Sequence, residues 1–163
     1  MNLYDDCLMA SIYSTINIGK FVVKQHFFSK FNMEQTNSIH EAGRYIWNAR
    51  QLLSEKAGKD GEYYTDRKYV KMAGHTAWCG VLVVLDATLK VREGLKKGQR
   101  PDIKDYQEAI AKADKKMPRI LMNSYDTLYK ILGYDGNLRF KIVQDGLDEA
   151  QEIIDWASKR HQN

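Results

Sequence analysis

The chain has 163 residues, 44% of them apolar, which is enough for one domain with a sizeable core. Its net charge of +4 lies well below the basic excess of a dedicated nucleic-acid-binding protein, so an acidic partner is permitted but not required. The two cysteines, Cys7 and Cys79, have neither the spacing of metal ligands nor the density of a disulfide-stapled secreted domain, and a cytoplasmic protein is expected.

Residues 1–32 differ in character from the rest of the chain. They are rich in Asn, Ile, Phe, Lys and Tyr, they carry Asp5 and Asp6 where a signal peptide carries cations, and they are too polar to span a bilayer. Two alternatives stay open: a translated extension that could lie on a membrane surface, or a start assigned upstream of Met33. We therefore separate an N-terminal extension, 1–32, from a single helical-bundle domain, 33–163, and expect no membrane span.

The first helix of the domain is predicted to begin at Ser38. Ser38 and Glu41 form an S-x-x-E capping box, in which each side chain accepts a hydrogen bond from an otherwise unpaired backbone N–H. Gly58 is the predicted stop, and the polar turn GKDGE follows. The apolar residues between recur at helical spacing: Ala42, Tyr45, Ile46, Ala49, Leu52 and Leu53.

A second, longer helix is predicted from Thr65 to Lys97, with Gly98 as its terminator and Pro101 just beyond. The β-branched run VLVVL at 81–85 lies inside this helical pattern and has no turn signal beside it. No segment is therefore predicted as a strand.

Three further helical segments complete the pattern. Asp102 is the predicted cap of the third, and Pro118 predicts a kink or a fresh start because its ring does not fit an unbroken helix interior. The fourth is predicted to end at Gly133, and Asn137 is the predicted cap of the last. Short connections between long amphipathic segments predict an all-α fold, an up-and-down bundle of four to five helices.

The stretch YYTDRKYVKMAGHTAW, at 63–78, is the most chemically suggestive of the chain. At roughly 100° per residue, Tyr64, Lys68, Lys71 and His75 fall within one arc of about 60°. A phenol, two ammonium groups and an imidazole in one row suit a phosphate or carboxylate, so these four are the candidate ligand-binding residues. The competing interpretation is a solvated face, with His75 at the point where the helix enters the core.

Tyrosines and glycines are the other features of note. Tyr125, Tyr129 and Tyr134 could join Tyr63 and Tyr69 in a tyrosine-lined groove, although such residues more often rim a core. Inside the second predicted helix, two glycines each cost about 1 kcal/mol relative to alanine and thus predict a close helix crossing. They are Gly74 and Gly80.

No catalytic residue, metal ligand or cofactor is predicted. The chain contains no Glu-x-x-His pair, no H-E-x-x-H, no phosphate-binding P-loop and no G-x-S-x-G. The absence of a recognisable nucleophile and base favours a binding protein over an enzyme.

Three stretches carry a resemblance to a family: EAGRYIWNARQLLSEK at 41–56, YYTDRKYVKMAGHTAWCGVLVVLDATLK at 63–90, and YDTLYKILGYDGNLRFKIVQDGLDEAQEIIDWA at 125–157. The chain resembles an uncharacterised bacterial family known only as a domain of unknown function. The resemblance covers about residues 38–158, implies a helical bundle, and supplies no activity.

More distantly, the tyrosine-rich entry to the second helix and the core run AGHTAWCGVLVVLDATL are similar to HEPN domains. These are helical bundles often found as ribonuclease toxins or nucleotide-binding partners. Active members carry an Arg and, after four to six residues, a His, whereas Arg67 and His75 here have seven residues between them. This departure argues against ribonuclease chemistry, so the resemblance implies a binding-only version.

Three functions follow as hypotheses. The favoured one is a non-catalytic bundle that binds a protein partner or self-associates as a homo-oligomer. The alternative is a HEPN-like module that binds a nucleotide or RNA through Tyr64, Lys68, Lys71 and His75. The third, less favoured, is a nuclease or other hydrolase with His75 as acid or base.

Overall fold

The computed structural model describes residues 33, 36–96 and 98–162. The prediction on residues 1–32 therefore lies outside the described residues. The described bundle begins with a helix over residues 36–55. It continues with strands β1 (Lys59–Asp60) and β2 (Tyr63–Tyr64), helix α2 (Arg67–Leu89), the short 3₁₀ helix η1 (Val91–Gly94), α3 (Ile103–Ala113), α4 (Met117–Ser124), the π-helix η2 (Tyr125–Asp135) and α5 (Phe140–Gln162).

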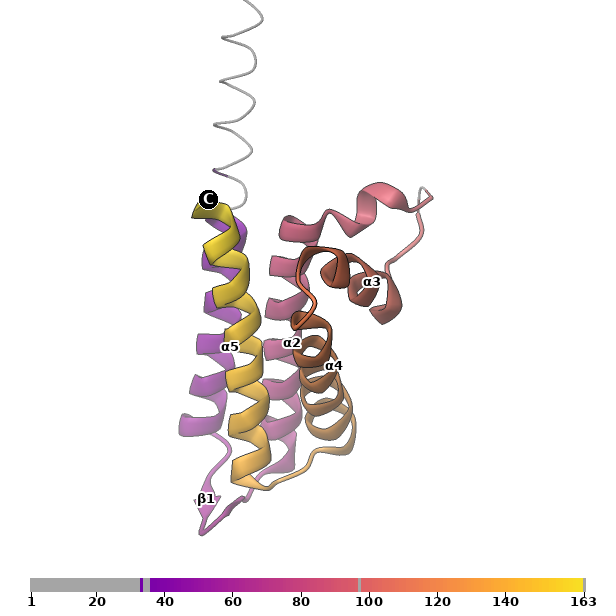
Figure 1. Ribbon diagram of the computed structural model, residues 1–163. Coiled ribbons are helices and arrows are strands. Elements are labelled where there is room, and N and C mark those ends of the chain that lie inside the picture. The colour runs from indigo at the N-terminus through magenta and orange to yellow at the C-terminus, as the bar shows by residue number, and fades with distance from the viewer. Residues whose placement is uncertain (1–32, 34–35, 97, 163) are drawn as a thin grey trace, which may run out of the picture. The chain divides into compact units, whose positions relative to one another are not determined.

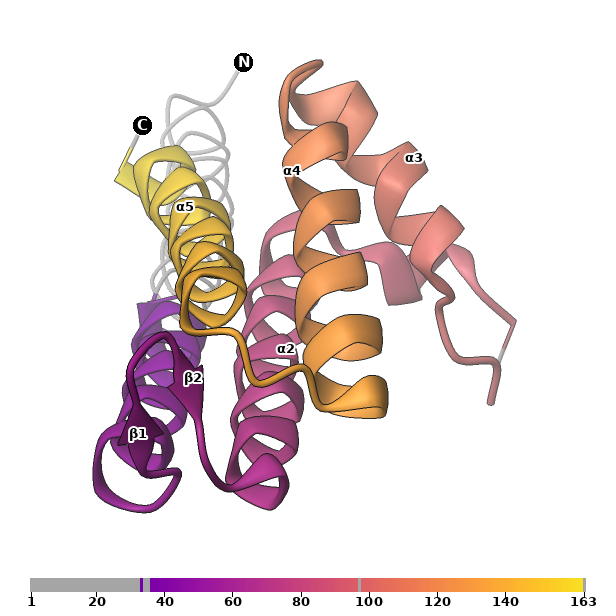
Figure 2. The ribbon, with the colours of Figure 1, turned by 90° about the horizontal axis from the view of Figure 1, so that it is seen from below.

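The long helices alternate in direction. Figure 1 shows the helix 36–55 and the α4–η2 segment running one way and α2 and α5 the other. Seen along the bundle, α2 lies between the helix 36–55 and α4, and α3 lies on the far side of α4 (Figure 2). The predicted all-α, up-and-down bundle is confirmed.

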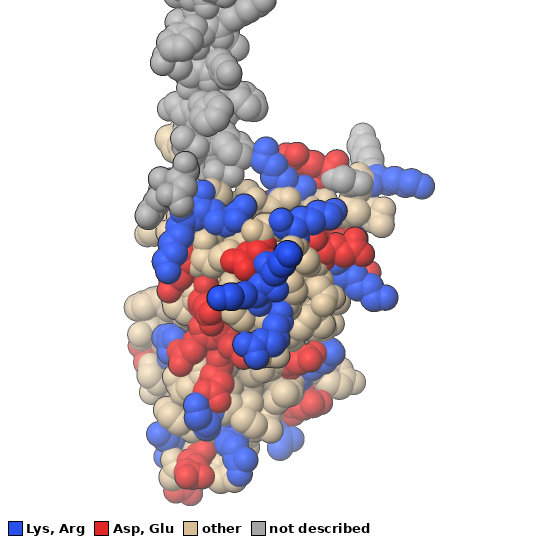
Figure 3. Space-filling model, in the orientation of Figure 1, with Lys and Arg blue, Asp and Glu red and all other residues tan. Residues whose placement is uncertain are grey.

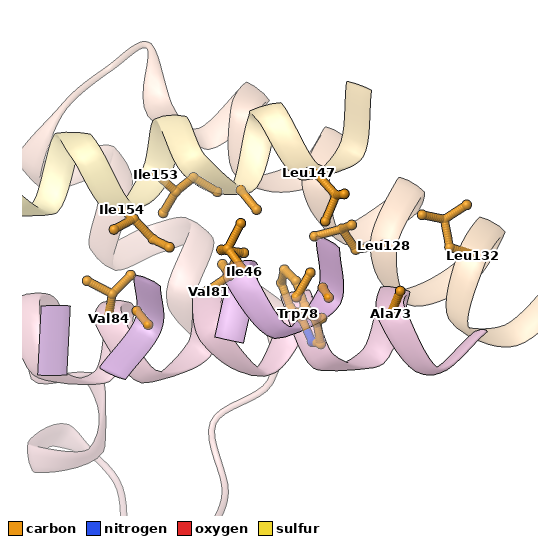
Figure 4. Close-up of a cluster of buried hydrophobic side chains, with 14 of the residues drawn as sticks. Ile46, Ala73, Trp78, Val81, Val84, Leu128, Leu132, Leu147, Ile153 and Ile154 are labelled. Atoms are coloured by element: carbon orange, nitrogen blue, oxygen red, sulfur yellow. The ribbon is translucent and has the colours of Figure 1, made fainter. Parts of the chain in front are cut away.

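The core lies between α2, α5, η2 and the helix 36–55. In Figure 4, Ile153 and Ile154 of α5 lie across from Val81 and Val84 of α2, with Ile46 close by. All five are buried, with at most 4% of their surface exposed. Each buried aliphatic side chain of this size stabilises the fold by about 1.5–3 kcal/mol relative to an exposed one, so this shared apolar interior holds the four segments together.

The composition of α2 reflects its place in the core. Within the described residues it is the single helix long and apolar enough to pass a length-and-composition test for a membrane span, and 44% of the qualifying window is buried inside the bundle. A helix with packed neighbours on two sides has the same composition as a spanning segment. The expectation of no membrane span stays a prediction.

Two local sequence signals are confirmed. Asp102 caps α3 by accepting from the backbone N–H groups of Lys104 and Asp105, and the Asp105 carboxylate accepts from the Asp102 N–H in return. Pro118 stands in the first turn of α4, where its missing N–H needs no partner, so the chain makes a fresh start there.

Several predicted helix limits are wrong, beginning with those of the first two helices. Residues 36 and 37 are already helical, so Ser38 lies inside the first helix and Glu41 pairs with Arg44 at 2.9 Å. The helix predicted to run to Lys97 ends at Leu89, because Lys90 adopts a left-handed conformation with φ of 51° and turns the chain into η1. Lysine at this position is not a turn signal in the sequence.

A small hairpin replaces the predicted polar turn. β1 and β2 pair antiparallel, with Lys59 opposite Tyr64, and Gly58 and Gly61 take the positive φ values that the turns require. The Tyr64 N–H donates to the Leu138 carbonyl at 2.8 Å, which ties the hairpin to the chain before α5. Two-residue strands leave no alternating pattern for a sequence to reveal.

Helix η2 runs on beyond the predicted end at Gly133. It ends at Asp135, and Gly136, with φ of 71°, is its left-handed cap. Asn137 does not cap α5 directly: its side-chain oxygen accepts from the Arg139 N–H, one residue before α5 begins at Phe140. π-helical segments are rare and often found at functional sites, so η2 draws attention to the face it shares with α2.

Candidate functional site

Tyr64, the first of the predicted ligand-binding residues, is not on the surface. It ends β2 with 5% of its surface exposed, its ring lies 5.7 Å from that of Phe140, and its hydroxyl accepts from the Gln144 amide at 3.3 Å. Burial raises the pKa of Tyr64, and the Gln144 hydrogen bond and the Arg50 charge oppose this rise. The helical projection failed because α2 begins only at Arg67, after its cap Asp66.

The other three predicted residues, Lys68, Lys71 and His75, lie on α2 but are not used alike. The ammonium of Lys68 lies 5.4 Å from the centre of the Tyr69 ring. Lys71 and His75 instead lie against the end of η2: a Cβ added to Gly136 would lie 2.8 Å from Cε of Lys71, and one added to Gly133 would lie 2.7 Å from Cε1 of His75. Lys71 and His75 thus both lie beside the end of η2, and Arg67 lies beside Gly136 as well.

Gly74 explains how α2 comes so close to η2. A Cβ at this position would lie 2.7 Å from the carbonyl oxygen of Leu128 and 2.9 Å from the backbone nitrogen of Gly133, so only glycine permits this contact. Gly80 has the same role toward the helix 36–55, where a Cβ would lie 3.0 Å from the Ala42 carbonyl oxygen. The predicted close crossings are confirmed, and they fix the distance between the side chains above them.

A row of four rings follows the seam between α2 and η2. His75 meets Tyr129 edge to face, with ring centres 5.7 Å apart; Tyr129 stacks on Tyr125 at 5.3 Å and 11°; and Tyr125 lies 5.3 Å from Trp78. Trp78 is almost buried, with 7% of its surface exposed, whereas Tyr129 is 42% exposed. The row therefore runs from the core to the solvent, with its inner ring fixed by packing.

The aromatic row opens into a groove of about 710 Å³ between this seam and the segment η1–α3. We call it the aromatic groove, and it is lined chiefly by Trp78, Tyr125, Tyr129, Tyr106, Arg92 and Arg100. A pocket of this volume lies in the range usual for small-molecule ligands, about 300–1,000 Å³.

Asp86 holds the far wall of the aromatic groove in place. Its carboxylate accepts from the Tyr106 hydroxyl at 2.5 Å and from Nε of Arg92 at 2.8 Å. Burial and the neighbouring Asp86 raise the pKa of Tyr106, so its hydroxyl stays protonated and donates. Arg100, exposed at the same groove, has no hydrogen bond or ion pair with any residue in the described part of the chain.

The predicted tyrosine groove is corrected in its membership. Tyr125 and Tyr129 line the aromatic groove, whereas Tyr63 belongs to the hairpin and pairs with Arg139. Tyr69 packs against the core. Arg92, Arg100 and Tyr106 were missed, because the turn at Lys90 that brings η1 and α3 back over α2 leaves no local signal.

Comparison with known proteins places the bundle in a family. A family described as Domain of unknown function (DUF5618) matches residues 37–159. The chain belongs to this family. A solved structure, described as a protein of unknown function from Dyadobacter fermentans, is 39% identical with a TM-score of 0.71, over 77% of this chain and 97% of that one. No curated protein matches the chain.

The DUF5618 match covers the described bundle and confirms the predicted uncharacterised family. The HEPN resemblance stays a prediction. In this DUF5618 chain the described residues hold no group of three His, Cys, Asp or Glu side chains placed to bind a metal ion. What the aromatic groove offers is ring surface, an exposed arginine and a fixed wall, which together suit the binding of a flat, anionic ligand.

Proposed function

We propose that this domain is a non-catalytic binding module that holds a nucleotide or a short single-stranded RNA in the aromatic groove. The observation that carries the proposal is the row of rings from Trp78 through Tyr125 to Tyr129, which opens beside Arg100. Proteins that bind single strands combine aromatic platforms for the bases with cations for the backbone, and this groove has both.

The energies favour such a ligand. Each base that stacks on an aromatic side chain contributes about 1–3 kcal/mol, and stacking works for every base because each has a flat face. Arg100 lies on the same groove with no described partner, so it can contact a phosphate without first giving up an ion pair. At the other end of the row, Lys71 and His75 add donors near the end of η2.

The net charge of the side chains that line the aromatic groove is small. Asp86 neutralises Arg92, and Asp102, which also lines the groove, is engaged as the cap of α3. We therefore expect few phosphate contacts and a weak salt dependence, as suits a nucleotide or a few linked nucleotides rather than a long duplex. The favoured sequence hypothesis, binding of a protein partner or self-association, concerns other surfaces and is compatible with this one.

The test is fluorescence anisotropy with a labelled oligouridine, and competition by AMP and ATP. Tyr129→Ala should weaken binding by about 1–3 kcal/mol. Arg100→Ala should weaken it for all sequences alike and reduce the salt slope by about 1. The matched controls are Tyr63→Ala, on the hairpin, and Arg44→Ala, on the helix 36–55, both exposed and both outside the groove.

Three results would contradict the proposal. They are the absence of binding by the unsubstituted protein, binding that is indifferent to both groove substitutions, and equal losses in the two controls. Cleavage of the oligouridine that disappears in His75→Ala would instead establish the nuclease hypothesis.

A further inference from the structure

A second groove lies on another part of the bundle. It runs between the start of α4 and α5, has a volume of about 750 Å³, and has a partly apolar floor made by Met117, Ile120 and Trp156. Met117 is buried and the other two are half-buried. We call it the charged groove, because one side is lined mainly by acidic side chains and the other mainly by basic ones.

The two walls differ in sign. Figure 3 shows a column of acidic side chains beside a cluster of basic ones on this face. The acidic wall is the α5 side, where Asp148, Glu152 and Asp155 outnumber the single cation Lys159. The basic wall is the side formed by the α3–α4 connection and the first turn of α4, where Lys115, Lys116 and Arg119 outnumber Asp114. The Asp114 carboxylate accepts from the backbone N–H of Lys116.

The cations of the basic wall are not paired with acidic side chains of the described residues. In the described part of the chain neither Lys115, Lys116 nor Arg119 forms an ion pair, and Glu152 on the opposite wall forms none either. Asp148 is engaged, through Arg50 at 3.0 Å. The two walls therefore attract each other only across the open groove, and both can pair with charged groups of another molecule.

We propose that this face binds a second copy of the chain, about a two-fold axis parallel to α5. Rotation about such an axis, lying in the plane of contact, exchanges the two sides of the face. The acidic wall of one copy then meets the basic wall of the other, twice, and the two apolar floors enclose the space between them. A polar rim around an apolar centre is the usual anatomy of a protein interface.

The charges select a second copy over other ligands. A nucleic acid or an anionic membrane would be attracted by Lys116 and Arg119 but repelled by Glu152 and Asp155 a short way across the groove. A basic peptide meets the converse problem. A surface that carries both signs side by side complements a surface with the same two signs exchanged, and the face of an identical copy provides this.

The test uses charge reversal on each wall separately. An acidic-wall variant, Glu152→Lys with Asp155→Lys, and a basic-wall variant, Lys116→Glu with Arg119→Glu, are compared with the unsubstituted protein by sedimentation velocity at low and high salt. We expect a dimer for the unsubstituted protein that weakens with salt, and loss of the dimer in each variant alone. Glu55→Lys, an exposed charge reversal on the helix 36–55, is the control and should stay dimeric.

Mixing the two variants gives the decisive measurement. One variant then has two basic walls and the other two acidic walls, so equal amounts should form a one-to-one dimer that neither forms alone. Circular dichroism of each variant shows whether it remains folded, and recovery of the mixed dimer would itself exclude misfolding. A monomeric unsubstituted protein at high concentration and low salt, or folded variants that stay monomeric when mixed, would overturn the proposal. So would dimerisation that ignores both reversals.

Discussion

Gly74→Ala offers a direct test of how tightly α2 is held against η2. The added Cβ would lie 2.7 Å from the Leu128 carbonyl oxygen, 2.8 Å from Cβ of Leu132 and 2.9 Å from the Gly133 nitrogen. All three atoms are fixed by the backbone of η2, so none can move away by a side-chain rotation. The two helices would have to separate, and with them the aromatic row they support.

Two opposing effects set the magnitude. Alanine is favoured over glycine inside a helix by about 1 kcal/mol, whereas forcing an extra methyl group into a packed contact costs about 1–3 kcal/mol and sometimes more. Because three backbone-fixed contacts fall below 3.0 Å, we place the packing cost in the upper part of that range. The unfolding free energy should then fall by about 1–2 kcal/mol. Each kcal/mol lost lowers the Tm of a domain of this size by roughly 2–4 °C.

Gly43→Ala is the matched control, and urea denaturation is the assay. Gly43 is also helical, in the segment 36–55, and a Cβ added there meets nothing within 4 Å. This variant should be more stable than the unsubstituted protein by up to about 1 kcal/mol. If Gly74→Ala is as stable as Gly43→Ala, the tight crossing of α2 and η2 does not exist, and the support of the aromatic row is lost with it.

Three further predictions follow from single contacts. Burial raises the pKa of Glu149, so the contribution of this residue to stability is present at acid pH and is lost as pH rises through the raised pKa. Glu149→Gln should therefore raise the Tm at pH 7 but not below the unfolded pKa near 4.5. Thermal melts at both pH values measure this difference. Tyr106→Phe removes the hydrogen bond to Asp86, and should cost about 2 kcal/mol in urea denaturation and weaken ligand binding in the aromatic groove. Gly133→Ala places a Cβ against the His75 ring, which can rotate away; the Tm should hardly change, while the imidazole NMR signals shift as the ring leaves Tyr129.

The fold class could be read from the sequence because helical periodicity is a local signal with many repeats. The cap at Asp102 and the break at Pro118 were found for the same reason, since each depends on one residue and its near neighbours. The end of α2 was not found. Lys90 takes a left-handed conformation that tertiary contacts, among them the Arg92–Asp86 ion pair, must stabilise against its own preference.

The candidate site could be predicted only in part from the sequence. Lys71 and His75 lie on α2 beside the end of η2, and their common edge could be projected because that projection needs only the helical repeat. Tyr64 was misplaced because the projection was extended past the cap at Asp66, where the repeat no longer applies. Arg100 could not be assigned at all, since its proximity to Tyr129 depends on how α3 folds back over the bundle.

Helix α3 joins the two grooves. Its first turns contribute Ile103 and Tyr106 to the aromatic groove, and the connection after its last residue contributes Lys115 to the charged groove. One hydrogen bond holds each end, from Tyr106 to Asp86 and from Arg160 to the Ala113 carbonyl oxygen. A ligand in the aromatic groove and a second copy at the charged groove would therefore each contact α3 or the connection that follows it.

If both proposals hold, the two binding equilibria are thermodynamically linked. The factor by which dimerisation changes the ligand affinity of the aromatic groove then equals the factor by which the ligand changes the dimerisation constant. Comparison of the dissociation constant for ligand in the unsubstituted dimer with that in the basic-wall variant measures this factor. Equal constants would show that the two grooves are not coupled.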